Sequence, residues 1–112
     1  GESIADVNAA RLVWEEAVRT VERIGPMGAN APIDAQVSVR LAGAQVVLLA
    51  NQAINRLAAA AGASAGMASS PLQRQLRDVQ MMRGHVMFDW DRTATLAGKV
   101  KLGLPTTPAD LL

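Results

Sequence analysis

The most chemically capable part of the chain is residues 71–91, which surround its single histidine. This segment reads PLQRQLRDVQMMRGHVMFDWD and holds three arginines and three aspartates besides His85. Asp89 follows His85 by four residues, so on a helix its carboxylate lies within reach of a ring nitrogen. An imidazole held in this way can donate a hydrogen bond or move a proton, which makes His85 and Asp89 the candidate catalytic pair. The alternative is a solvated ion pair that adds only modest support to the helix.

An adjacent arginine and aspartate, Arg77 and Asp78, form a second candidate group. Neighbouring side chains on a helix point about 100° apart, so each of the two needs its own partner. Arg77 can bind a phosphate or a carboxylate through two parallel hydrogen bonds. Ordinary ion pairs between helices explain the same two residues without any ligand.

Residues 71–102 are predicted to form one long helix with two distinct sides. The polar side consists of Arg74, Asp78, Met81 or Met82, His85, Asp89 and Arg92. The apolar seam consists of Leu72, Leu76, Val79, Val86, Trp90, Thr93, Ala97 and Val100. Arg83 is the one charged residue that interrupts this seam.

The segment before this helix, residues 62–70, reads GASAGMASS and is predicted to be a connection. Ser70 and Pro71 are a typical helix start, with serine as the N-cap and proline at the first helical position. The free N–H groups of that start can hold an anion, although the segment lacks a defined phosphate motif. The methionines Met67, Met81, Met82 and Met87 can line an apolar cleft or simply fill the core.

Composition narrows the function classes. The chain has 112 residues, which corresponds to one domain, and a formal net charge of +1, which does not favour nucleic-acid binding. It has no cysteine and one histidine, so disulfides, thiolate zinc sites and multi-histidine metal sites are excluded. The apolar content of 50% argues against intrinsic disorder.

Three helices are predicted, at about residues 4–24, 34–61 and 71–102, and the fold class is therefore all-α. The first helix carries one apolar stripe, made of Val7, Ala10, Trp14, Ala17, Val21 and Ile24. The second is apolar over most of its circumference, which indicates burial by more than one neighbour. Its most apolar run, residues 41–50, is ten residues long, against the ~18 or more of a membrane span. No signal peptide is recognised at the start, so the chain is expected to be cytoplasmic.

The length of these helices predicts an elongated shape. Residues 71–102 as one helix span ~48 Å, whereas a compact chain of this size has a radius of gyration of ~13 to 14 Å. The helices are therefore expected to form an antiparallel up-down bundle. Three helices leave the broad apolar face of the second uncovered, so a fourth is expected from a partner chain or another segment of the protein.

Several local motifs resemble a known family. They are the Gly/Ala/Ser segment 62–69, Ser70-Pro71-Leu72-Gln73-Arg74, Leu76-Arg77-Asp78, His85 to Trp90, and Leu102-Gly103. Together they resemble the C-terminal helical domain of the acyl-CoA dehydrogenase superfamily, and most closely its flavin-dependent two-component monooxygenases. The resemblance covers about residues 62–103, and the first two helices are similar to the family only in length and pattern.

The resemblance implies a three-domain flavoprotein whose C-terminal four-helix bundles pack into tetramers. A separate reductase supplies reduced FMN or FAD in the monooxygenase branch, and oxygen then hydroxylates an aromatic or other small substrate. The histidine that matches His85 lies near the flavin ring, and the acid that matches Asp89 lies near the substrate. The loop ending at Ser70, with Arg74 and Arg77, lies near the flavin or a subunit interface.

The same resemblance implies that residues 1–112 are a C-terminal bundle domain of a longer flavoprotein. Alone, the chain is expected to bind no flavin, to be inactive, and to associate into a dimer or tetramer through its apolar face. Acyl-CoA dehydrogenases usually carry a Glu-Gly pair after the Arg-Asp segment, but no glutamate lies between Asp78 and Asp91. This departure favours a monooxygenase over a dehydrogenase or oxidase. A non-catalytic oligomerisation module is the third alternative.

Overall fold

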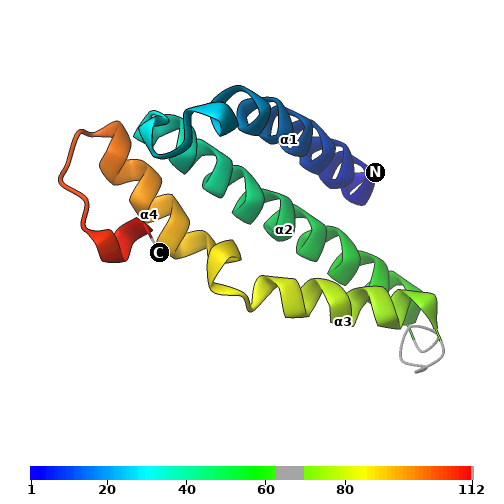
Figure 1. The fold of residues 1–112 in the computed structure, drawn as a ribbon. Helices are drawn as coiled ribbons and strands as arrows, with labels where there is room; N and C mark the ends of the chain where they lie inside the picture. The colour runs from blue at the N-terminus through cyan, green and yellow to red at the C-terminus, as the bar shows by residue number, and fades with distance from the viewer. Residues whose placement is uncertain (63–69, 112) are drawn as a thin grey trace.

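The computed structural model describes residues 1–62 and 70–111, and within these residues the chain is helical with no strand (Figure 1). The α-helices are α1 (Glu2–Ile24), α2 (Ile33–Ala61), α3 (Pro71–Arg83) and α4 (Trp90–Lys101). Short 3₁₀ turns are η1 (Gly25–Asn30), η3 (Val86–Phe88) and η4 (Pro108–Leu111). The all-α prediction is confirmed.

The first two helices form an antiparallel pair, as predicted, and their bounds lie within two residues of those expected (Figure 1). The chain leaves α1 at Gly25-Pro26, where proline cannot continue an i to i−4 hydrogen-bond ladder. Arg56 of α2 ties the far end of the pair together. Its guanidinium lies 3.0 Å from the Asp6 carboxylate and 3.1 Å from that of Glu2.

Helix α2 is the centre of the fold, because it packs against α1, α3 and α4. Its buried residues recur along its whole length: Ala35, Val37, Ala44, Val47, Asn51, Ala53 and Ile54. This arrangement explains its wide apolar arc. By length and composition α2 could also cross a membrane, a test that the core helix of a soluble protein passes as well. Helix α2 contacts α1, α3 and α4, although only 17% of its 18-residue apolar window is buried within the described residues.

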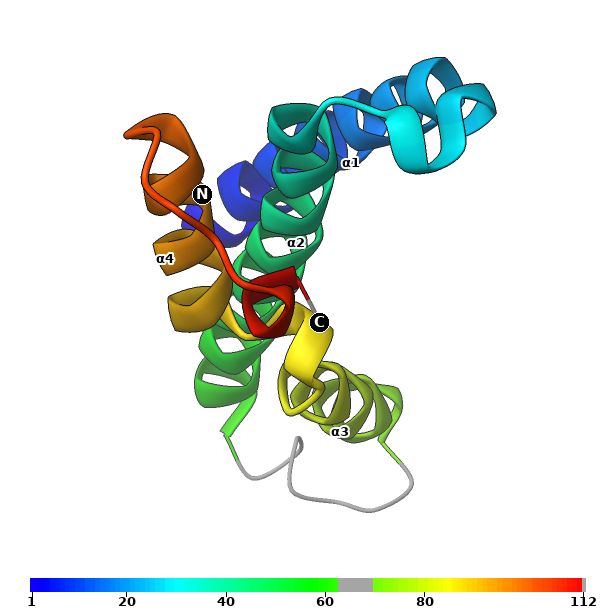
Figure 2. The ribbon, with the colours of Figure 1, turned by 60° about the vertical axis from the view of Figure 1, so that its left-hand side comes forward.

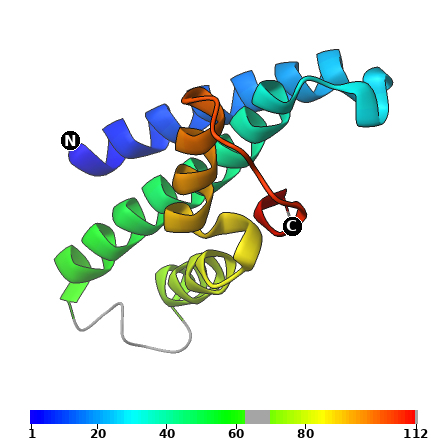
Figure 3. The same cartoon turned by 90° about the vertical axis from the view of Figure 1, so that its left-hand side faces the viewer.

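The prediction of one helix over residues 71–102 is wrong, because the chain breaks between Arg83 and Trp90. Gly84 has low helix propensity, and its N–H makes the last bond of α3, to the Gln80 carbonyl at 3.2 Å. Asp89 then starts a new helix by accepting the Arg92 N–H at 3.2 Å. Figures 2 and 3 show α3 and α4 as separate helices with different directions, both on α2.

The molecule is elongated, as predicted, with extents of 50 × 25 × 22 Å and a radius of gyration of 16.4 Å. Its core is thin and built from small side chains such as Ala44, which is fully buried. Large apolar residues of α1 remain substantially exposed, namely Ile4, Val7, Leu12, Trp14, Val18 and Val21. Part of the predicted α1 stripe, including Trp14, is therefore only incompletely covered, while Ala17 and Ile24 are buried.

Candidate functional site

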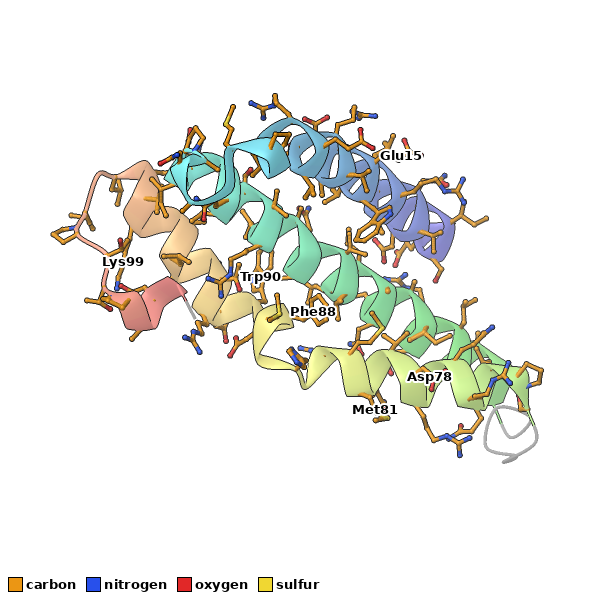
Figure 4. The ribbon with its side chains drawn as sticks, in the orientation of Figure 1. Glu15, Asp78, Met81, Phe88, Trp90 and Lys99 are labelled. Atoms are coloured by element: carbon orange, nitrogen blue, oxygen red, sulfur yellow. The ribbon has the colours of Figure 1, made fainter. Side chains whose placement is uncertain are left out.

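The break between α3 and α4 opens a hollow of about 340 Å³. We call it the His85 hollow, and its walls are Leu48, Arg83, Gly84, His85, Phe88, Asp89, Trp90 and Asp91. Figure 4 shows Phe88 and Trp90 close together beside the turn that leads into α4. The two predicted catalytic residues, His85 and Asp89, thus line one cavity, even though the helix expected to carry them does not form.

The His85 ring has a defined orientation although it is exposed. Its Nδ1 accepts a hydrogen bond from the Met87 backbone N–H at 3.2 Å. The ring centroid lies 5.9 Å from that of Phe88, at an interplanar angle of 55°. Since Nδ1 is an acceptor, the neutral ring carries its proton on Nε2. Nε2–H is therefore the atom that can donate to a group bound in the hollow.

The predicted pairing of Asp89 with His85 is wrong. It required both residues on one helix, and His85 lies between α3 and η3. The Asp89 Oδ1 instead caps α4 through the Arg92 N–H. No hydrogen bond joins the two side chains in the part of the chain that the structure describes. Asp89 can still face a ligand with its second oxygen, and its catalytic role stays a prediction.

Arg83 is a wall residue of the hollow that sequence analysis did not single out as functional. It lies on the seam side of α3, with Leu76 and Val79, which are partly buried. Within residues 1–62 and 70–111 its exposed guanidinium has no hydrogen bond or ion pair. The sequence feature that could have identified Arg83 as functional is its position as the one charged residue within the apolar seam. Trp90 and Asp91 were missed because they belong to the wall only after the helix breaks.

The predicted cofactor residues lie outside the hollow. Ser70 precedes α3, and its carbonyl, rather than its hydroxyl, accepts the Arg74 N–H at 3.2 Å. Arg83 follows Arg74 by nine positions on the same helix, so the two side chains point about 180° apart. Arg74 and Arg77 are exposed, and neither is paired with any residue that the structure describes, nor is Asp78. The rest of the predicted anion loop, residues 63–69 with Met67, lies outside the described residues.

An apolar groove of about 370 Å³ lies on the other side of Phe88. Its main walls are Trp14, Val18 and Val21 of α1, Gly43 of α2, and Met87 and Phe88 of η3. Phe88 therefore separates this groove from the His85 hollow. Of the methionines predicted to line a cleft, Met87 does so, whereas Met81 is 77% exposed on the outer side of α3 (Figure 4).

Residues 1–90 match the family described as acyl-CoA dehydrogenase, C-terminal domain. The chain belongs to this family.

Two relatives come from the same comparisons. The chain is 33% identical over 108 residues to the oxygenase component of p-hydroxyphenylacetate 3-hydroxylase from Acinetobacter baumannii. The match covers 96% of the chain but only 25% of that relative. The crystal structure of 3-HSA hydroxylase from Rhodococcus sp. RHA1 superimposes with a TM-score of 0.84 at 27% identity, over 97% of this chain and 28% of that one. The chain thus spans about a quarter of each hydroxylase.

Proposed function

We propose that this chain acts as the C-terminal helical domain of a flavin-dependent monooxygenase, the oxygenase of a two-component system. The observation that carries the proposal is the His85 hollow, in which an oriented imidazole faces an open cavity with aromatic walls. The two similar proteins are both hydroxylases, which supports the same class. Because the chain spans a quarter of their length, the rest of the active site belongs to other parts of such an enzyme.

The residues present fit one side of a flavin site. Leu48, Phe88 and Trp90 offer flat apolar surface for a ring system, and His85 offers a donor beside it. Arg74 and Arg77 are exposed cations suited to a phosphate, although they project from a different side of α3. A bound reduced flavin, FMN or FAD, would supply the electrons that activate oxygen.

The chain's own residues supply binding and proton transfer. His85 holds a proton on Nε2 and can donate it to an electron-rich atom in the hollow, while the Met87 N–H keeps the ring in place. Asp89 contacts the substrate through the carboxylate oxygen that does not cap α4. Phe88 and Trp90 exclude water from one side of the cavity.

The proposal includes three further points. A separate flavin reductase is the partner that delivers reduced flavin, as the name "oxygenase component" of the A. baumannii relative suggests. Dimers or tetramers form through the helical bundle, which the exposed apolar residues of α1 support. The enzyme works in the cytoplasm.

The test is an anaerobic titration of reduced FMN and of reduced FAD into the full-length protein that carries this chain. Oxygen is then admitted with p-hydroxyphenylacetate as the probe phenol. We expect saturable binding and hydroxylated product. His85→Ala should lower the product formed per flavin oxidised by on the order of a hundredfold. His85→Gln retains a donor near Nε2 and should lose less, while Lys101→Ala, on the exposed end of α4, should change nothing.

Other results assign other functions. Unchanged product yield in His85→Ala contradicts the role of this residue. If acyl-CoA bleaches bound FAD, the protein is a dehydrogenase or oxidase, which the lack of glutamate between Asp78 and Asp91 argues against. If neither reduced flavin binds, the domain serves only to assemble subunits.

A further inference from the structure

The segment after α4 folds back onto that helix. Gly103 adopts φ +69°, and the N–H of Leu104 bonds the Lys99 carbonyl at 2.9 Å, a helix end that reverses the chain. The turn η4 then lies beside α4 (Figure 1). Asp110 holds this turn together by accepting the Thr107 N–H at 2.7 Å, and it pairs with Lys99 at 3.3 Å.

Arg92 connects this turn to the His85 hollow. Its guanidinium Nη2 donates to the Ala109 carbonyl at 2.7 Å, while its own backbone N–H donates to Asp89. Arg92 itself is half-buried. It occupies the first turn of α4, next to Trp90 and Asp91, which are walls of the hollow. One residue thus contacts the C-terminal turn with its side chain and the hollow's carboxylate with its backbone.

We propose that Arg92 is a positioning residue for the His85 hollow and that the C-terminal turn, residues 107–111, holds it in place. Docking of the turn restrains the start of α4, where the N-cap Asp89 and the first-turn residues Trp90 and Asp91 are walls of the hollow. Docking of the turn and the arrangement of the hollow's wall residues are therefore thermodynamically linked. Undocking the turn should loosen the wall, and a disturbed wall should weaken docking. Only the naming of the hollow as a reaction site rests on the proposed function.

The linkage is measured by amide hydrogen exchange of residues 90–93 and by the NMR signal of His85, the chain's single imidazole. Arg92→Ala and removal of residues 105–112 should each speed exchange at 90–93 by about fivefold, as expected for one lost partly exposed hydrogen bond to a charged group. Both should shift the His85 signal. Exchange at the centre of α2, around Ala44, should not change.

Two comparisons separate positioning from general loss of stability. Arg92→Lys keeps a cationic donor for the Ala109 carbonyl and should restore most of the protection. Arg92→Ala in the shortened chain should add nothing further, because both changes remove one interaction. Lys101→Ala removes a cation from the same helix that has no hydrogen bond or ion pair among the described residues, and it should behave as the unaltered chain.

The proposal is overturned if removal of residues 105–112 leaves both exchange at 90–93 and the His85 signal unchanged. It is also overturned if Arg92→Ala speeds exchange at residues 90–93 no more than it speeds exchange throughout α2. Neither readout requires flavin. If the linkage is observed but reduced flavin does not bind, only the proposed function is rejected. If reduced flavin binds but the linkage is not observed, only the role of Arg92 is rejected.

Discussion

Asp89 has two tasks that a substitution can separate. Its Oδ1 caps α4, and the same side chain lines the His85 hollow. Capping requires only a side-chain oxygen that accepts a backbone N–H, and serine or asparagine provides one as well as aspartate does. A contact between carboxylate and substrate needs the charge. Stability and activity should therefore respond differently to the same set of substitutions.

Asp89→Ala should lower the free energy of unfolding by about 1 kcal/mol, because the Arg92 N–H loses its acceptor. Asp89→Ser should retain nearly all of this stability. Urea unfolding of the three proteins, followed by circular dichroism, measures both values. If Asp89→Ser were as unstable as Asp89→Ala, the side chain would be stabilising the fold by a contact other than the cap.

The C-terminal turn η4 is an element whose docking depends on one carboxylate. The hydrogen bond from the Thr107 N–H, and then that from Lys99, lower the pKa of Asp110 below its ordinary value of 3.8. A lowered pKa in the folded state means that the ionised form stabilises docking. Docking is therefore fully present above the pKa that Asp110 has in the unfolded chain. It is lost as the pH falls through the lower pKa that Asp110 has in the folded chain.

We expect the Thr107 amide signal to stay constant from neutral pH down to about pH 4 and to move towards its undocked position below that. The groups that face Asp110 are the Lys99 ammonium and the backbone N–H and hydroxyl of Thr107. Asp110→Asn should abolish the transition. A transition well above pH 4, or one that persists in Asp110→Asn, would show that another group controls docking.

At the scale of the whole molecule, α1 carries an exposed apolar stripe made of Val7, Trp14, Val18 and Val21, and this stripe predicts association. Val18 and Trp14 lie in the wall of the apolar groove and remain 37% and 56% exposed. Burying such surface is favourable by about 25 cal/mol per Å². The chain should therefore be a dimer or larger in solution unless another segment of the protein covers the stripe.

Val18→Asp should shift the mass measured by light scattering towards that of a monomer, because a charge in the stripe opposes its burial. Met81→Asp is the matched control, since Met81 is 77% exposed on the outer side of α3, away from the groove. A folded monomer for the unaltered chain would contradict the predicted association. Equal effects of the two substitutions would place the interface elsewhere.

The sequence by itself determined the features that depend on neighbouring residues. Apolar periodicity and the Gly25-Pro26 stop placed α1 and α2 within two residues of their ends, and local motifs such as Ser70-Pro71 and Leu76-Arg77-Asp78 indicated the family. The elongated shape was predicted from a single helix over residues 71–102, which does not form; the 29-residue helix α2 accounts for the elongation instead. His85 and Asp89 were predicted as a hydrogen-bonded pair; they line the same hollow, but the pairing does not form.

The tertiary structure decided how residues 83–91 are arranged. The chain can either continue one helix through Gly84 or end it there and cap a new helix at Asp89. Which of the two forms depends on how α3 and α4 pack against α2, and the periodicity of apolar residues carries no information about that packing. Because the helix breaks, Arg83, which interrupts the predicted apolar seam, lines the hollow instead. It also separated Arg74 and Arg77 from His85. Docking of η4 through Arg92 and Ala109, 17 residues apart, is likewise a contact that only the folded chain creates.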